Sequence, residues 1–417
     1  MSGVRAAVVV TGTELVRGDR QDRNGPFLAA ELYRLGLEAA RVTIVGDRPE
    51  ELAAALEEGL RADVLVISGG LGPTHDDRTV ELLARAAGRE LQVDPGLEAE
   101  IEGVSRRIAD RLRRPYGEFA AGVRKQASLP QGASSLGLAG TAPGVVLDTG
   151  SCVAVALPGP PPELQRLWHA ALESEPVARV LARVEPPQRR TLRFFGVSES
   201  AVARVFEQAG GESDGVEVTI CARDYEVHVD LVGGGDIVAA ALRTELGSYL
   251  FAEDERPIAQ IVLDRCREEG LTLAAGESCT GGLVAALLTA VSGASDVFVG
   301  GVVAYANEVK RDQLHVAEEL LARHGAVSAE VAAAMAVGAR ERFDADVAVA
   351  VTGIAGPGGG TPEKPVGLVY LSASSPGGDR ALEFVAHGDR DGIRRRAAVA
   401  ALHLVRRLLT HNGHEGM

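Results

Sequence analysis

Short apolar runs that each end in a polar, glycine-rich loop recur along this chain, and helix-like segments follow most of these loops. Residues 4–10 run into Thr11-Gly12, and residues 64–67 run into Ser68-Gly69-Gly70. Continuous β-branched runs of this length are typical of parallel strands that are covered on both faces. The repeated order of strand, loop and helix predicts α/β domains with doubly wound sheets.

The chain has 417 residues, which is more than one ordinary hydrophobic core accommodates, so several domains are expected. Residues 173–190 are charged and contain three prolines, a composition typical of a connector. A β-α-β-β-α pattern follows, with its last helix expected over residues 237–250, and then a polar hinge at 252–257. We therefore predict three domains, 1–172, 173–255 and 256–417, of which the middle one is a small α+β domain.

Three strand-like runs in the last third of the chain lead into loops with reactive side chains. The runs are residues 271–275, 297–304 and 347–351, and the loops after them carry Ser278, Lys310 and Thr352. Ligand sites in open α/β sheets gather at the carboxyl ends of strands, so these loops are expected to meet. A serine nucleophile needs a base, these motifs contain no histidine, and a desolvated lysine can take that role. The sequence predicts a Ser278/Lys310 pair.

Two other interpretations of this loop stay open at this point. A serine or threonine just before a helix is most often a cap for unpaired N–H groups. Cys279 is a rival nucleophile, because a thiolate is stabilised near a helix N-terminus. The residues alone do not decide between Ser278 and Cys279.

The motifs around these residues resemble the CinA C-terminal family, whose members deamidate nicotinamide mononucleotide. They are ESCTGG at 277–282, GGVVAYANEVK at 300–310, GAVS at 325–328, TGIAGPGGGTPEKPVG at 352–367 and GDRDGIRR at 388–395. The resemblance implies an acyl transfer without a cofactor, in which Ser278 attacks, Lys310 is the base and N–H groups of residues 279–282 hold the oxyanion. Further expected catalytic residues are Thr352, Tyr305 and Ser328, and expected substrate contacts are Thr280, Gly281, Gly282, Asn307, Gly353, Gly356, Arg394 and Arg395.

The glycine loops near the amino terminus have two equally weighted interpretations. Glycine-rich backbone at a helix start can cradle a phosphate, but neither loop is a Walker or GxGxxG sequence. Both could instead be tight turns, with Asp77 as a helix cap.

A second resemblance favours a ligand site there. GTELVRGDRQDRN at 12–24, SGGLGPTHDD at 68–77, KQA at 125–127, GTAPG at 140–144 and LPGPPPE at 157–163 resemble the MoaB/MogA-type molybdopterin-binding domain of CinA. This implies nucleotide contacts at Gly12, Thr13, Glu14, Asn24, Ser68, Gly69, Gly70, Gly72, Thr74 and Lys125, and a divalent metal at Asp76 and Asp77. Because some CinA proteins hydrolyse ADP-ribose with a metal, a pyrophosphatase is an alternative or additional activity. A non-enzymatic nucleotide- or pterin-binding regulator is the third possibility.

The remaining observations concern partners and location. The middle segment resembles the KH-like domain of CinA, but Gly233-Gly234-Gly235 is followed by Asp236, so a structural or dimer-bridging role is favoured over RNA binding. A net charge of −15 argues against a general nucleic-acid or anionic-membrane partner. Four scattered cysteines predict no disulfide framework, and no apolar run reaches membrane-spanning length, so a cytoplasmic location is expected. A homodimer is also expected.

Overall fold

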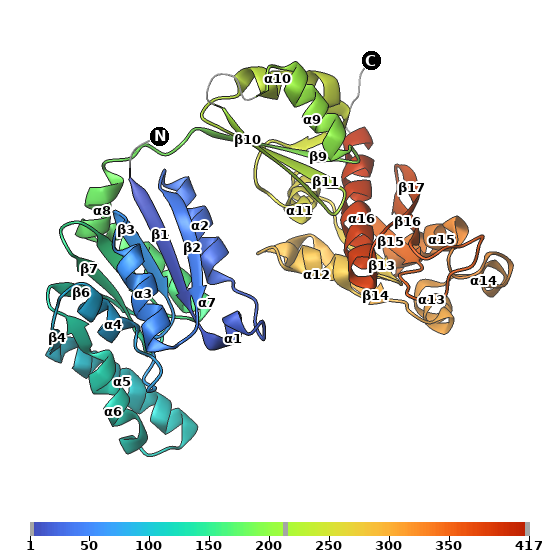
Figure 1. Ribbon diagram of the computed structural model, residues 1–417. Helices are drawn as coiled ribbons and strands as arrows, with labels where there is room; N and C mark the ends of the chain where they lie inside the picture. The colour runs from blue at the N-terminus through green and yellow to red at the C-terminus, as the bar shows by residue number, and fades with distance from the viewer. Residues whose placement is uncertain (1–3, 212–215, 413–417) are drawn as a thin grey trace. The chain divides into compact units, whose positions relative to one another are not determined.

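The computed structural model describes residues 4–211 and 216–412, which form two compact units, Met1–Pro187 and Gln188–Met417. Figure 1 shows that each unit has β-sheets with helices packed against them. Buried apolar side chains form core clusters of their own in each unit. The predicted α/β class is confirmed.

The first unit is organised around a six-stranded sheet with the order β2-β1-β3-β8-β7-β6. Four neighbouring strands are parallel: β2 (Glu38–Val45), β1 (Arg5–Thr11), β3 (Val64–Ser68) and β8 (Val153–Leu157). The sheet continues antiparallel through β7 (Pro143–Asp148) and β6 (Ala133–Leu138). β3 and β8 are buried along their whole length, which explains their continuous apolar sequences.

Helices cover both faces of this sheet. One face packs against α2 (Asn24–Arg34) and α7 (Pro161–Glu173), and the other against α3 (Pro49–Gly59), α4 (Thr79–Ala86) and α5 (Pro95–Leu112). The short helix α1 (Thr13–Val16) follows β1, and α5 forms a hairpin with α6 (Gly117–Gln126) beside the small ladder of β4 (Leu91–Val93) and β5 (Ser128–Pro130). No helix within residues 4–211 and 216–412 is long and apolar enough to cross a membrane.

The expected connector at 173–190 contains a helix, which corrects the sequence prediction. α8 spans Glu175–Leu181 and buries Val177 and Val180 in the core of the first unit. Pro176 lies in the first turn of α8, where its missing N–H costs no helical hydrogen bond. The division between the two compact units accordingly falls at Pro187. The three-domain division stays a prediction.

The second unit begins with an antiparallel sheet of order β10-β11-β9-β12. Its elements are β9 (Arg189–Phe195), α9 (Glu199–Gln208), β10 (Glu217–Arg223), β11 (Glu226–Val232), α10 (Asp236–Leu246), η2 (Gly247–Tyr249) and β12 (Leu250–Ala252). The helix predicted over 237–250 is therefore too long, because α10 spans Asp236–Leu246 and a 3-10 turn separates it from β12. It ends before Gly247, and Leu250 pairs with Phe194 in the sheet, so strand pairing overrides the helical pattern there.

A five-stranded sheet forms the rest of the second unit, with the order β14-β13-β15-β16-β17. β13 (Leu273–Glu277) is parallel to β14 (Phe298–Val303) and to β15 (Val347–Gly353). β16 (Leu368–Ser375) and β17 (Gly378–Val385) complete the sheet as an antiparallel hairpin. β13 is the central parallel strand, so the loops after all three parallel strands emerge at one edge.

The two faces of this sheet differ in side-chain size. Leu273, Val347 and Val349 pack against α11 (Ile258–Glu269), α12 (Leu283–Thr289) and α16 (Arg390–Asn412). The opposite face carries Ala274, Ala348 and Ala350 and packs against α13 (Asn307–Leu314) and α15 (Ala329–Arg342). η3 (Ala294–Asp296) precedes β14, and α14 (Glu318–His324) precedes α15. Small residues on the second face let α15 approach the strands closely.

α16 also joins the two sheets of the second unit, as Figure 1 shows. His403 of α16 is fully buried, stacks on Phe195 and lies 2.8 Å from a carboxylate oxygen of Glu226 in β11. His228 contacts the other oxygen of Glu226 at 2.9 Å. Burial lowers the pKa of His403 to about 4, so the ring is neutral near pH 7. The antiparallel sheet and the five-stranded sheet therefore share packing within one unit.

Candidate active site and the strand-end loops of the first unit

Ser278 lies in the turn between β13 and α12. Its backbone N–H donates to the carbonyl of Val351 at 2.8 Å, which ties the turn to the neighbouring strand β15. Gly281 and Gly282 have φ angles of +61° and +94°, conformations that strain any residue with a side chain. These two glycines allow the chain to turn sharply into α12, and the side chain of Ser278 is left 8% exposed.

Lys310 reaches this turn from α13, the helix that follows β14 in the chain. Its Nζ lies 3.2 Å from Ser278 Oγ, 2.8 Å from the carbonyl oxygen of Ala304 and 3.3 Å from that of Tyr305. A neutral amine has two N–H groups, which suit the two carbonyls, and one lone pair, which suits the serine hydroxyl. The same three contacts also suit an ammonium that donates to all three oxygens, so the geometry allows both protonation states.

Burial of Lys310 favours the neutral amine. Lys310 is 1% exposed, and this desolvation lowers the pKa of its ammonium group. The nearby Cys279 and Glu308 act in the opposite direction, and burial is the larger effect. The predicted Ser278/Lys310 pair is thus brought together, and its base is shifted toward the reactive form.

Cys279 is a poor nucleophile in this structure. Burial raises the pKa of its thiol to about 12, and the side chain is 5% exposed. A thiol in that state carries very little thiolate near neutral pH. The alternative that Cys279 is the nucleophile is therefore less well supported than attack by Ser278.

Two of the four N–H groups expected to hold the oxyanion are already engaged. Gly281 donates to the carbonyl of Ser278 at 3.1 Å, and Gly282 donates to the carboxylate of Glu277 at 2.9 Å. Of the predicted donors 279–282, this leaves Cys279 and Thr280, whose N–H groups make no hydrogen bond to another residue in the described part of the chain. The Thr280 hydroxyl is also buried without a partner, which a bound ligand or water would relieve.

The start of α16 brings arginines to all three strand-end loops. Arg394 donates to the carbonyl of Thr280 at 2.9 Å. Arg390 donates to the carbonyl of Gly356 at 2.5 Å and to the Tyr305 hydroxyl at 2.9 Å. Tyr305 is 61% exposed, so its ring is accessible to a ligand. The two arginines form a cationic rim beside the Ser278 turn.

Arg390 is the first residue of α16 and belongs to the same GDRDGIRR motif as Arg394 and Arg395, but the sequence-based prediction did not include it. Arg390 and Arg394 are one helical turn apart and so lie on one side of α16. That i, i+4 spacing was the available signal. Arg395 is exposed and makes no ion pair or hydrogen bond to the described residues.

The other predicted residues lie around the site in varied roles. Thr352 is fully buried and donates to the carbonyl of Ala326 at 2.7 Å. Ser328 caps α15 by accepting from the N–H of Val331. Neither hydroxyl contacts Ser278 or Lys310, so the catalytic role expected of these two residues stays a prediction. Asn307 is exposed at the start of α13, Gly353 is the last residue of β15, and Gly356 lies in the loop that follows.

In the first unit, the ends of β1, β3 and β8 are tied together by side chains. Asn24 donates from its amide to Ser68 Oγ at 2.8 Å and to the carbonyl of Gly159 at 2.7 Å. Thr13 donates to Asp47, a residue that the sequence did not single out, and this contact anchors the loop after β1. A methyl group on Gly69 would lie 2.6 Å from the carbonyl of Thr11, so glycine is required where the loops cross.

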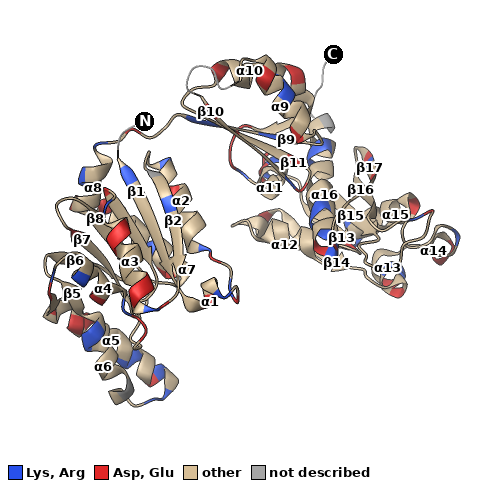
Figure 2. Ribbon diagram, in the orientation of Figure 1, with Lys and Arg blue, Asp and Glu red and all other residues tan. Residues whose placement is uncertain are grey.

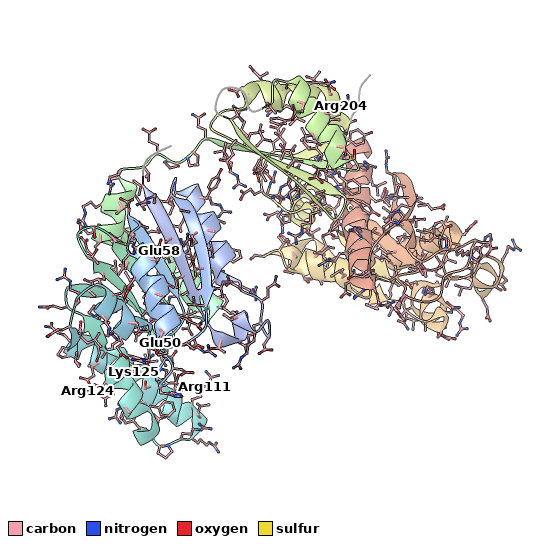
Figure 3. All side chains as sticks on the ribbon, in the orientation of Figure 1. Glu50, Glu58, Arg111, Arg124, Lys125 and Arg204 are labelled. Carbon is pink, nitrogen blue, oxygen red and sulfur yellow. The ribbon has the colours of Figure 1, made fainter. Side chains whose placement is uncertain are left out.

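The 68–77 loop is also the place where the hairpin of α5 and α6 meets the sheet. Lys125 donates to the carbonyl of Thr74, and Figure 3 labels Lys125 together with Arg111 and Arg124 at this end of the unit. A cavity of about 120 Å³ next to the loop is lined in part by Gly70, Gly72, Asp77, Lys125 and Gln126. Gly12 and Glu14 lie close together at the start of α1. The structure thus brings Gly70, Gly72 and Lys125 to one cavity, whereas Gly12 and Glu14 lie at the start of α1.

The predicted metal ligands are side by side but do not form a complete set. The hydroxyl of Thr74 lies within hydrogen-bonding distance of both Asp76 and Asp77. No group of three histidine, cysteine, aspartate or glutamate side chains in the described ranges is arranged to hold a metal ion. These two carboxylates would need ligand oxygens to complete a coordination shell.

The two units match two different family models. Residues 7–178 match a model described as a probable molybdopterin binding domain, and residues 255–409 match the CinA C-terminal domain. The fold thus defines a protein in which these two domains are combined in one chain.

Full-length relatives share this combination. A CinA-like protein of Mycolicibacterium gilvum is 44% identical over 98% of this chain and 99% of its own length. A CinA-like protein of Mycobacterium tuberculosis is 42% identical over 97% of both chains. The chain belongs to the CinA-like family. It is also similar to the competence/damage inducible protein CihA from Agrobacterium tumefaciens, at 44% identity, with a TM-score of 0.35 over 36% of this chain and 93% of that one.

Proposed function

We propose that the second unit hydrolyses nicotinamide mononucleotide to nicotinate mononucleotide and ammonia. The observation that carries the proposal is the 3.2 Å contact between Lys310 Nζ and Ser278 Oγ, buried beside the turn into α12. Membership of the CinA-like family supports it, because the two residues that the resemblance assigns as nucleophile and base are the ones that make this contact.

The proposed reaction is an acyl transfer in two halves. Ser278 Oγ attacks the carboxamide carbon while Lys310 takes the hydroxyl proton, and collapse of the tetrahedral intermediate releases ammonia that carries this proton. Water then attacks the acyl-enzyme, with Lys310 again as the base, and frees the carboxylate product and Ser278. The N–H groups of Cys279 and Thr280 stabilise the oxyanion in both halves, at about 3 kcal/mol for one donor.

Substrate selection falls to the groups around this pair. Arg390 and Arg394 offer cationic donors for the phosphate of a mononucleotide. Tyr305, exposed and held at its hydroxyl by Arg390, offers a face for the pyridine ring. A substrate with an aromatic carboxamide at one end and a phosphate at the other suits this arrangement.

Ammonia release tests the proposal directly. The full chain is incubated with nicotinamide mononucleotide, and ammonia and nicotinate mononucleotide are measured. We expect equal amounts of both products from the natural chain and none above background from Ser278→Ala. A natural chain without turnover contradicts the proposal, as does a fully active Ser278→Ala variant.

We also propose that the first unit binds a nucleotide diphosphate such as ADP-ribose at the 68–77 loop. Asn24 favours this second function, because its amide oxygen is buried without a partner where three strand ends meet. Calorimetry of the full chain with ADP-ribose, with and without Mg²⁺ or Mn²⁺, tests it. Binding followed by cleavage supports a pyrophosphatase, binding alone supports a regulatory site, and no binding contradicts both. A homodimer of the chain stays a prediction that light scattering can check.

A further inference from the structure

Glu277 is a buried carboxylate next to the nucleophile, and the proposed mechanism assigns it no role. It is the last residue of β13 and is 2% exposed. One of its oxygens accepts from the N–H groups of Gly282 and Val284, at 2.9 and 3.1 Å, and the other accepts from Ala285 at 2.9 Å. A single side chain thus satisfies three backbone donors in the first turn of α12.

This bonding decides which donors in the turn remain available. The N–H of Gly281 is used by the carbonyl of Ser278, and Glu277 uses those of Gly282, Val284 and Ala285. In the described residues, the N–H groups of Cys279 and Thr280 are left without an acceptor from another residue. A carboxylate already at the helix start also disfavours a second anion there, so a substrate phosphate is better placed at Arg390 and Arg394.

We propose that Glu277 is a positioning residue for the deamidation: it holds the turn so that the Cys279 and Thr280 N–H groups face the developing oxyanion. This inference rests on the proposed function. Glu277 does not touch the substrate in this scheme. It acts by fixing both ends of the segment that contains Ser278, since its own backbone belongs to β13 and its side chain is bound to α12.

The test combines steady-state kinetics with a probe for the oxyanion site. Pyridine-3-boronic acid is expected to react with Ser278, forming an Oγ–B bond while Lys310 takes the hydroxyl proton. The resulting tetrahedral boronate places an anionic oxygen where the oxyanion forms. Its inhibition constant is measured beside kcat and KM for the full-length natural chain, for Glu277→Gln and for the control Asp346→Asn.

Asp346→Asn is a matched control because Asp346 also accepts a backbone N–H, from Thr272, but at the opposite end of β13 and β15. For Glu277→Gln we expect kcat to fall by about 100-fold, the effect of losing one oriented donor. The inhibition constant of the boronate should rise by a similar factor, with KM changed by less than about threefold. Asp346→Asn should melt at a lower temperature and keep the natural kcat and boronate inhibition.

If Glu277 only caps α12, a different result is expected. If Glu277→Gln lowers the melting temperature but leaves kcat and boronate inhibition unchanged, the positioning role is wrong. If Glu277→Gln does not fold, Glu277→Asp replaces it, since the shorter carboxylate cannot reach all three N–H groups, and the same outcomes apply. A natural chain that binds the boronate but releases no ammonia contradicts the proposed function, and the change in boronate inhibition still tests Glu277.

Discussion

The turn after β13 and the loop after β3 have the same plan, a parallel strand that runs into a glycine loop and a helix, but they differ in burial. Lys310 and Thr280 are almost fully buried beside Ser278, whereas Thr74 and Asp76 are exposed. Figure 2 shows that residues of both charge signs occur in both units, so the difference is local. Burial shifts the pKa of Lys310, whereas the exposed charged residues of the 68–77 loop remain accessible to solvent.

The chemistry of the two loops follows from this difference. Burial lowers the pKa of Lys310, which prepares it to take a proton. The hydrogen bond from Thr74 lowers the pKa of Asp76, which keeps that carboxylate ionised. The first arrangement is suited to bond cleavage and the second to binding. Four experiments test this contrast.

Removal of the nucleophile should have the largest effect. Ser278→Ala is expected to lower kcat for nicotinamide mononucleotide by about 1,000-fold or more, because no other buried group replaces the attacking oxygen. Cys279→Ala should stay within about threefold of the natural rate, because its thiol is protonated and only fills space. Ammonia release measures both. Equal loss in the two variants would assign the attack to neither residue alone.

Replacement of the base should be nearly as severe. Lys310→Arg is expected to lower kcat by about 100-fold or more, since a guanidinium cannot accept the proton of Ser278. In the natural chain kcat should rise with pH through the lowered pKa of Lys310, because the amine is neutral only above that pKa. Rate measurements from pH 5 to 10 test this. Near-natural turnover of Lys310→Arg would remove Lys310 from the mechanism.

Loss of the rim arginine should act on binding more than on turnover. Arg390→Ala removes the contacts to Gly356 and Tyr305 and one candidate phosphate donor. We expect KM to rise by about tenfold, as for one charged hydrogen bond, with kcat changed by less than about threefold. The control is Arg267→Ala, because Arg267 lies on α11 and forms ion pairs with Asp264 and Asp296. An unchanged KM for Arg390→Ala would place the phosphate elsewhere.

The smallest effect on deamidation is expected from the exposed loop. The double variant of Asp76→Asn and Asp77→Asn should leave ammonia release within about twofold of the natural rate, because these residues belong to the first unit. The same variant should weaken metal-dependent binding of ADP-ribose in calorimetry if these carboxylates share the metal with the ligand. A large loss of deamidation would show that the two units do not work independently.

Several features of this protein follow from local sequence alone. The β-branched and alanine-rich runs identify the strands, and the glycine loops after them locate both sites, because apolar periodicity and turn chemistry are short-range signals. Ser278 could therefore be placed at a strand-to-helix turn. Lys310 could be proposed as its base because the strand-end loops contain no histidine, and the family resemblance added Arg394 and the ligand contacts of the 68–77 loop.

Only the tertiary structure decided the features that depend on distant parts of the chain. Lys310 meets Ser278 because β13 and β14 pair in parallel, and its lowered pKa comes from burial, which no local pattern measures. The three donors held by Glu277, the contacts of Arg390 and the burial of α8 also arise from packing. Local sequence determines which elements form, whereas the free energy of burial decides which side chains meet and in what protonation state.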